Sequence, residues 1–117
     1  MIDISRILIC GGRDYDPIKV VAWLDENIKN NPEAIIHGCA TGADTGAAIW
    51  ASNKLVKQFS FPANWQKHGK AAGPIRNQSM IDHGKPTLVI AFPGGKGTAD
   101  MVKRANAARI QVIMVAD

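Results

Sequence analysis

The residues in this sequence best suited to chemistry lie in one glycine-rich segment, Phe92–Asp100, which reads FPGGKGTAD. It follows an apolar run, Thr87–Ala91, that is typical of a buried strand, and it precedes Met101–Ala108, which is typical of a helix. Glycines let a backbone approach an anion closely, and the free N–H groups at a helix start favour negative charge. The segment predicts a phosphate-binding loop, with a plain strand-to-helix turn as the alternative. The groups that would hold the phosphate are backbone N–H groups and one hydroxyl, from Gly94, Gly95, Gly97 and Thr98.

A second glycine loop follows the first apolar run of the chain and contains Gly11, Gly12, Arg13 and Asp14. Its glycines allow another close approach of the backbone to a ligand. Arg13 is a rigid, two-pronged donor that suits a phosphate or a carboxylate. A solvated surface arginine is an equally good interpretation of that position.

Two aspartates occupy helix starts, where each has a structural and a functional interpretation. Asp44 lies beside Thr41 and Gly42 in the first turn of an expected helix, and Asp100 follows the glycine-rich segment. A carboxylate there stabilises the helix dipole by about 0.3–1 kcal/mol without any function. The functional alternative is a hydrogen bond to a ribose hydroxyl and, for Asp100, a residual catalytic role.

Arg76 and Trp65 lie in polar stretches rather than on a periodic apolar face. We expect Arg76 to contact the ligand. Trp65 is suited to stacking on a base, although covering the edge of the core is an equal alternative. Trp23 and Trp50 fall on expected helices and are interpreted as packing residues.

Other types of chemistry find little support in the sequence. His37, His68 and His83 form no metal-ligand spacing with cysteine or carboxylate, so we expect no metal and no cofactor. No Ser-His-Asp or Cys-His arrangement is visible, and a Walker-type phosphate loop is absent. Cys10 and Cys39 each end an apolar run, and we expect both to be small buried thiols in a reducing cytoplasm.

The composition is that of one globular domain spanning residues 1–117. Apolar residues make up 46% of the chain and charged residues 21%. No apolar run approaches the roughly 20 residues that span a membrane, and no signal-peptide pattern is present, so we expect a cytoplasmic protein. The net charge of +4 and the pI near 9.3 suit an anionic ligand. The basic residues are scattered, so nucleic acid is permitted but not favoured.

Strand-like and helix-like segments alternate along the chain. Five strands are expected, at Arg6–Cys10, Ala34–His37, within Leu55–Phe61, at Thr87–Ala91 and at Ile110–Val115. Four helices are expected, from Pro17 to about Asn30 with Asp16 as the cap, from Asp44 through Trp50, from Pro74 through Ile81, and over Met101–Ala108. The stretch from Ala63 to Gly73 is expected to be a connection. This alternation predicts a Rossmann-like α/β domain with a parallel sheet between two helical layers, in which the three glycine loops meet at the carboxyl edge.

Four motifs in this order resemble the YspA-type, cpYpsA-related branch of the SLOG superfamily. They are GGRDY from Gly11, HGxAxGAD from His37, GKAAGPxRNxxM from Gly69 and FPGGxGT from Phe92. The superfamily also includes LOG-type phosphoribohydrolases, molybdenum-cofactor carrier proteins and the central domain of DprA. The resemblance implies a Rossmann-like sheet and a site for a nucleotide-derived molecule.

In LOG-type enzymes an arginine and acidic residues carry hydrolysis of an N-glycosidic bond. Arg76 matches that arginine, Asp100 stands where the first family glutamate is found, and Met101 occupies the second position. Because a carboxylate stabilises the oxocarbenium-like state, its loss favours a protein that only binds.

Three functions follow, of which the first is favoured: binding of a nucleotide-derived ligand such as an ADP-ribose-like or nucleoside-phosphate molecule. The alternatives are a phosphoribohydrolase that uses Arg76 and Asp100, and a single-stranded nucleic-acid binder. A homodimer or higher homo-oligomer is expected, with Ala99–Ala108 as a candidate surface. The expected ligand-binding residues are Gly11, Gly12, Arg13, Asp14, Gly38, Thr41, Gly42, Asp44, Trp65, Arg76, Asn77, Pro93, Gly94, Gly95, Gly97, Thr98 and Asp100.

Overall fold

Five parallel strands form a single sheet in the computed structural model, which describes residues 2–117. The strands are β1 (Arg6–Cys10), β2 (Ala34–His37), β3 (Lys57–Ser60), β4 (Leu88–Ala91) and β5 (Gln111–Met114). Their order across the sheet is β3-β2-β1-β4-β5, and every neighbouring pair is parallel. The expected α/β class and parallel sheet are therefore confirmed.

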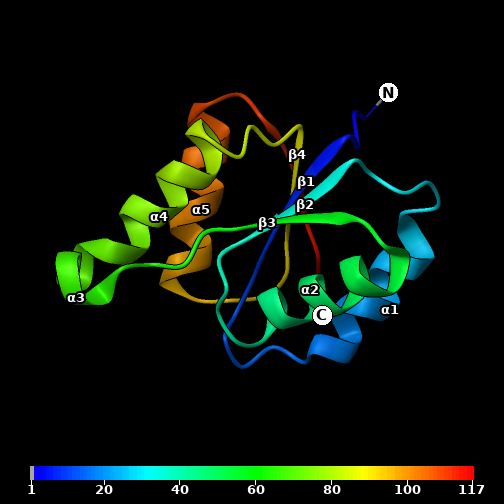
Figure 1. Ribbon diagram of the computed structural model, residues 1–117, viewed down its shortest axis with the longest axis horizontal. Helices are drawn as coiled ribbons and strands as arrows, with labels where there is room; N and C mark the ends of the chain where they lie inside the picture. Colours follow the sequence, from blue (N-terminus) through cyan, green and yellow to red (C-terminus); the bar gives the residue numbers. More distant parts are fainter. Residues whose placement is uncertain (1) are drawn as a thin grey trace.

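Helices cover both faces of this sheet. They are α1 (Pro17–Asn27), α2 (Ala43–Lys54), α3 (Trp65–His68), α4 (Ala72–Asp82) and α5 (Lys96–Ala107), with a 3₁₀ turn at Gly69–Ala71. Figure 1 shows α1 and α2 on one side of the sheet and α4 and α5 on the other, with α3 projecting beyond the sheet on the left. The result is the expected three-layer, Rossmann-like arrangement.

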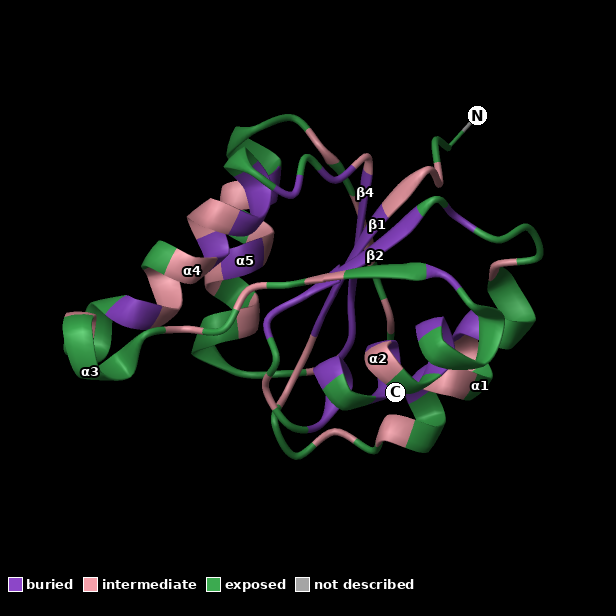
Figure 2. Cartoon of the chain, in the orientation of Figure 1, coloured by how far each residue is buried: buried purple, intermediate pink, exposed green. Residues whose placement is uncertain are grey.

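Alternate residues of β1 face the two helical layers. Ile7 and Ile9 pack with the layer of α1 and α2, while Leu8 and Cys10 pack with the layer of α4 and α5. The strands β1, β2 and β4 are almost wholly buried (Figure 2), which explains why their sequences are apolar apart from the end residues Arg6 and His37. The edge strands β3 and β5 are half-buried to exposed.

The strand order places a topological switch point between β1 and β4. From β1 the chain moves outward through β2 to β3, and it then crosses back to place β4 on the other side of β1. The loops that follow β1 and β4 consequently lead to helices on opposite faces, α1 and α5, and residues of both loops line a common cleft. Ligands of open α/β sheets bind in such crevices.

Several expected element boundaries differ from the structure. The stretch Ala63–Gly73 is not a plain connection: it contains α3, capped by the Asn64 side chain, then the 3₁₀ turn and the first residues of α4. The described residues contain five α-helices rather than four. Helix α1 ends at Asn27, three residues early, and α5 begins at Lys96 within the glycine-rich segment. Asp16 caps α1 as expected, since its side chain accepts a hydrogen bond from the Ile18 N–H.

Candidate functional site

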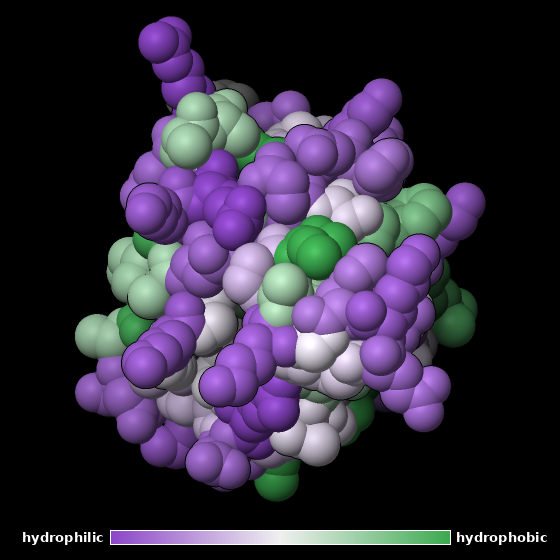
Figure 3. All heavy atoms as spheres, turned by 90° about the vertical axis from the view of Figure 1, so that its left-hand side faces the viewer, coloured by the Kyte–Doolittle hydropathy of each residue, from purple (hydrophilic) through white to green (hydrophobic). Residues whose placement is uncertain are grey.

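A cleft of about 670 Å³ lies at the carboxyl ends of the strands. Its wall combines the loops after β1, β2 and β4 with α3, the start of α4 and the start of α5. Figure 3 views the molecule from the side of α3 and α4, where most side chains are hydrophilic and apolar ones form only small patches. The lining residues are Cys10, Gly11, Gly12, Arg13, Ala40, Asp44, Trp65, Lys70, Gly73, Pro74, Arg76, Asn77, Met80, Gly95, Lys96, Gly97, Thr98, Asp100 and Met101.

The start of α5 faces this cleft without a cap of its own. Gly95 is the N-cap residue and makes no side-chain hydrogen bond, and the first turn of α5 contains no acidic residue. A Cβ atom built on Gly95 or Gly97 would meet no other atom within 4 Å. The absence of side chains at these two glycines is therefore not required by packing, and it leaves the helix N–H groups open to the cleft.

Other glycines hold the loops of β1 and β4 together. The Gly12 N–H donates a hydrogen bond to the Pro93 carbonyl oxygen at 2.9 Å. A Cβ atom on Gly12 would lie 3.2 Å from the Gly94 Cα, and one on Gly11 would lie 2.6 Å from the Ala43 Cβ. Gly12 needs to be glycine because two backbones pass each other at the switch point, and Gly11 because the start of α2 lies against it.

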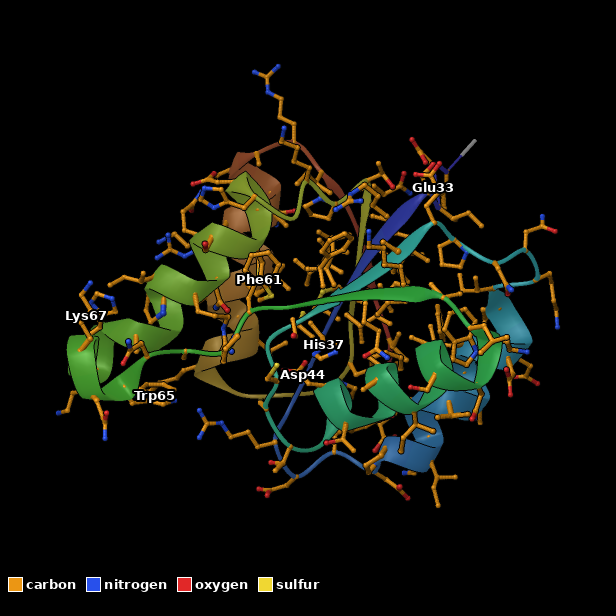
Figure 4. The ribbon with its side chains drawn as sticks, in the orientation of Figure 1. Glu33, His37, Asp44, Phe61, Trp65 and Lys67 are labelled. Carbon is orange, nitrogen blue, oxygen red and sulfur yellow. The ribbon has the colours of Figure 1, made fainter. Side chains whose placement is uncertain are left out.

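The carboxylate of Asp44 lies at the floor of the cleft. Its side chain is in the first turn of α2, 8% exposed, and its Oδ2 accepts a hydrogen bond from the Ala40 N–H at 3.0 Å. Burial raises the pKa of Asp44, and the Ala40 hydrogen bond and the charges of His37 and Arg76 oppose that shift. Figure 4 shows Asp44 close to His37, where the β2 strand ends.

Arg76 and Asn77 connect three walls of the cleft. Arg76 donates from Nη1 to the Gly38 carbonyl oxygen at 2.6 Å and from Nε to the Asn77 Oδ1 at 3.0 Å. Asn77 in turn donates from Nδ2 to the Gly97 carbonyl oxygen at 3.2 Å and to the Asp100 Oδ2 at 3.0 Å. This chain of hydrogen bonds fixes the loop after β2 and the start of α5 relative to α4.

Asp100 is held as an ionised carboxylate. Its Oδ2 accepts hydrogen bonds from Asn77 and from Arg104 Nε, the latter at 2.8 Å. Partial burial acts to raise the pKa of Asp100, but the two hydrogen bonds and the charge of Arg104 outweigh it, and the pKa is lowered. The group suits accepting a hydrogen bond or stabilising positive charge, and does not suit donating a proton at neutral pH.

Trp65 stands at the outer wall of the cleft. It is the first residue of α3, its side chain is half exposed, and the Arg13 guanidinium lies over its ring at 5.4 Å from the centroid. Figure 4 shows Trp65 on the projecting α3, away from the sheet. Trp50 is buried in the core and Trp23 packs edge-on against Phe92, so the interpretation of both as packing residues is confirmed.

The sequence matches the model of the family described as YspA, cpYpsA-related SLOG family over residues 5–68. It is also 33% identical over 123 aligned residues to the Gene 61 protein of Mycobacterium phage D29, an alignment that covers 96% of this chain and 97% of the phage protein. The chain belongs to the YspA, cpYpsA-related SLOG family. This confirms the resemblance, and membership is consistent with binding or processing of a nucleotide-related ligand.

The cleft of this SLOG-family chain brings together most of the expected site residues. Eleven of them line it: Gly11, Gly12, Arg13, Asp44, Trp65, Arg76, Asn77, Gly95, Gly97, Thr98 and Asp100. Gly38 and Thr41 line an adjoining cavity of about 270 Å³, which shares Arg13, Trp65 and Arg76 with the cleft. Gly42, Pro93 and Gly94 lie behind the lining, where their backbones pack against the loop after β1, and Asp14 is exposed outside both cavities.

Sequence reasoning missed two cations at the cleft, Lys70 and Lys96. Lys70 stands in the GKAAGPxRNxxM motif, so a signal was present for it, whereas Lys96 occupies the unspecified position of the FPGGxGT motif. The apolar lining residues Met80 and Met101 are not among the expected ligand-binding residues, although Met80 ends the GKAAGPxRNxxM motif and Met101 occupies a family acidic position; both also belong to the core layer under α4 and α5.

The two cysteines differ from each other, and the expectation that both are buried is wrong for Cys39. Cys10 is buried, and burial followed by the charge of Asp44 raises the pKa of its thiol to about 12. Cys39 is exposed, with a φ of 60°, because the chain turns sharply between β2 and the cleft. Its sequence position after an apolar run resembles that of Cys10, but the strand has already ended at His37.

Within residues 2–117, no group of three histidine, cysteine or acidic side chains is arranged to hold a metal ion. The helices of the same region are all too short or too polar to cross a membrane.

Proposed function

We propose that this protein binds a nucleotide-derived small molecule in the cleft, with a phosphate at the start of α5. The observation that carries the proposal is the uncapped start of α5, where Gly95 and Gly97 leave open space in front of free helix N–H groups. A phosphate there would receive backbone hydrogen bonds and the favourable end of the helix dipole. The Thr98 hydroxyl lies on the same wall.

The charges around the cleft support an anionic ligand that also carries hydroxyl groups. Arg13, Lys70, Arg76 and Lys96 all line the cleft. The cleft is also lined by two carboxylates, Asp44 and Asp100, which can accept hydrogen bonds from the hydroxyls of a ribose. A phosphorylated ribose combines both requirements in one molecule.

The Trp65 ring supports an aromatic part of the ligand, such as a nucleobase. It is half exposed and lines both the cleft and the adjoining cavity. A flat, exposed ring at the rim of a phosphate site is suited to stacking on a base. A nucleotide-derived molecule that extended from α5 to α3 would contact the open start of α5, the two carboxylates and the Trp65 ring.

Binding without cleavage is favoured over hydrolysis by the surroundings of Met101. Its side chain is 1% exposed and packs in the core layer with Met80 and Ala105. A second carboxylate at that position would need burial, so the cleft offers Asp100 as the only ionised acid on the α5 wall within the described residues. One carboxylate, already engaged by Asn77 and Arg104, supports positioning a ribose better than breaking its bond to a base.

The experiment that tests the proposal is incubation with nucleosides, mononucleotides, NAD and ADP-ribose, followed by ultrafiltration and mass spectrometry of both fractions. We expect a phosphorylated member to be retained intact. Release of free base or ribose phosphate with time would establish a hydrolase instead. Retention of none of these molecules, together with salt-sensitive binding of single-stranded DNA, would support the nucleic-acid alternative.

A substitution at the start of α5 tests whether the phosphate binds there. Gly95→Val places a side chain in the open space before α5 and should lower affinity for the retained molecule at least about tenfold, through steric exclusion of the phosphate. Ala107→Val puts the same side chain at an exposed position at the other end of α5 and should leave affinity unchanged. Undiminished affinity in a folded Gly95→Val protein would contradict a phosphate at this loop.

A further inference from the structure

The contact between Arg13 and Trp65 lies where the two cavities meet. Both residues line the 670 Å³ cleft and the adjoining 270 Å³ cavity. The guanidinium carbon of Arg13 lies 5.4 Å from the Trp65 ring centroid, which is the geometry of a cation–π contact. One face of the ring that would receive a base is therefore already occupied by a planar cation.

Arg13 is also placed to move toward the phosphate position. It directly follows Gly12, whose N–H is bonded to Pro93 at the entrance of the phosphate loop. Its side chain is exposed, and its guanidinium forms no hydrogen bond or ion pair with residues 2–117. Only the weak contact with an exposed ring holds it, and a phosphate offers stronger, charge-assisted bonds.

A second arginine, Arg76, adds to the preference of Arg13 for a phosphate over the Trp65 ring. Arg76 lines both cavities as well, and burial lowers its pKa; the nearby charge of Asp44 opposes that shift, and the charge of Arg13 adds a smaller lowering contribution. Whereas Arg76 is tied to the Gly38 carbonyl oxygen, Arg13 is free to respond. An anion placed between the two arginines would relieve their repulsion.

We propose that Arg13 makes the cleft selective for phosphorylated ligands by exchanging the Trp65 ring for the phosphate. Without a phosphate the guanidinium covers the ring and competes with a base. With a phosphate bound, Arg13 leaves the ring, and its face becomes available for the base. The two ends of a nucleotide are thus recognised together, whereas an unphosphorylated nucleoside meets a covered ring. This inference rests on the proposed function, because it assumes that the cleft takes a nucleotide-derived molecule.

The test measures Arg13→Ala against two matched probes: adenosine, and whichever of AMP and ADP-ribose the wild-type protein retains. For the phosphorylated probe we expect affinity to fall at least about tenfold, because a charge-assisted bond is lost. For adenosine we expect affinity to rise by about two- to fivefold, the equivalent of an exposed cation–π contact. Affinity changes of opposite direction for the two probes would show that Arg13 exchanges the Trp65 ring for the phosphate.

Three further variants separate exchange from simpler explanations. Arg13→Lys keeps the charge but loses the planar stacking group, so the phosphorylated probe should lose less affinity than in Arg13→Ala. In Trp65→Ala the substitution Arg13→Ala should no longer raise adenosine affinity, since no ring remains to uncover. Lys19→Ala, at an exposed position on α1 outside both cavities, should change neither affinity.

The outcomes distinguish this inference from the proposed function. If the wild-type protein binds a phosphorylated probe, and Arg13→Ala leaves adenosine affinity unchanged or lowers it, the exchange is wrong while the phosphate site stands. If the wild-type protein binds neither AMP nor ADP-ribose, the exchange is wrong, and the proposed function fails as well if no other phosphorylated member of the panel is retained. Because Arg13 is exposed, its substitution should not disturb folding, which thermal unfolding can verify.

Discussion

The starts of α2 and α5 have similar sequences but different structural roles. Each follows a central strand and begins at a glycine without a side-chain cap, Gly42 for α2 and Gly95 for α5. At α2 the glycine has a φ of 75° and packs against the backbone of Gly12 and Arg13, and the first turn already contains Asp44. At α5 the glycines face open space, and no acid is present in the first turn.

The difference shows how a glycine motif should be interpreted. At α2 glycine is required by the protein itself, and the helix dipole is served by an internal carboxylate. At α5 neither packing nor a φ in the left-handed region requires glycine at Gly95 or Gly97. We therefore assign the start of α2 to the architecture, whereas the start of α5 is left open for the proposed ligand.

The largest effect that this comparison predicts is on stability. Gly42→Ala combines a positive φ with an overlap between the new Cβ and the Gly12 carbonyl oxygen. It should lower the free energy of unfolding by about 3 kcal/mol or more, measured by urea denaturation. Gly97→Ala is the matched control, since its Cβ meets nothing and alanine is the better helix former; it should raise stability by up to about 1 kcal/mol. Equal effects of the two substitutions would remove the distinction between the helix starts.

A smaller effect is predicted when α5 is given the acid that α2 has. Gly95→Asp supplies a side-chain cap, so stability should stay the same or rise by a few tenths of a kcal/mol. The new negative charge should nevertheless weaken binding of the phosphorylated probe by about tenfold or more, because it occupies the anion position. Gly95→Asn is the control for charge, because it caps equally well and is neutral, and it should weaken binding less. If Asp and Asn had the same effect on affinity, charge at this position would not be what matters.

Much of the fold could be predicted from the sequence, and the reason is periodicity. Continuous apolar runs gave β1, β2 and β4 with nearly correct bounds, because these strands are buried on both faces. The helix α3 is not predictable in this way, because four residues with no buried side chain carry no periodic signal; the Asn64 cap is its only local indication. The expected start of α5 is too late, because glycines argue against a helix even where a helix begins.

The site was predictable in part, for a different reason. Parallel topology brings every loop after a strand to one edge, so the glycine loops had to converge there. Which glycines face the cleft could not be predicted, because that depends on the neighbours of Gly42 and Gly94 in space. The strand order and the Arg13–Trp65 contact also depend on tertiary packing between segments far apart in the sequence.

The smallest predicted effects concern the carboxylates near the two helix starts, whose pKa values are shifted in opposite directions. Asp100 has a lowered pKa, so its ionised form stabilises the folded state above the unfolded value of 3.8, and that stability is lost as the pH falls through the lower folded value. Asp44 has a raised pKa, so the folded state holds its proton more tightly, and stability is lost as the pH rises from 3.8 through the higher folded value.

Substituting each aspartate by asparagine should therefore give opposite pH profiles. Asp100→Asn should lower the free energy of unfolding by about 1 kcal/mol at pH 7, through loss of the charged bond with Arg104, and the deficit should shrink as the pH falls below 3.8. Asp44→Asn should gain stability relative to the wild type between pH 4 and pH 7, because a buried charge is removed while the acceptor for the Ala40 N–H is kept. Urea denaturation of both variants across this range measures the profiles. Parallel profiles would mean that the two carboxylates have the same environment, and the carboxylate of α2 could then no longer be distinguished from that of α5 as an internal, structural charge.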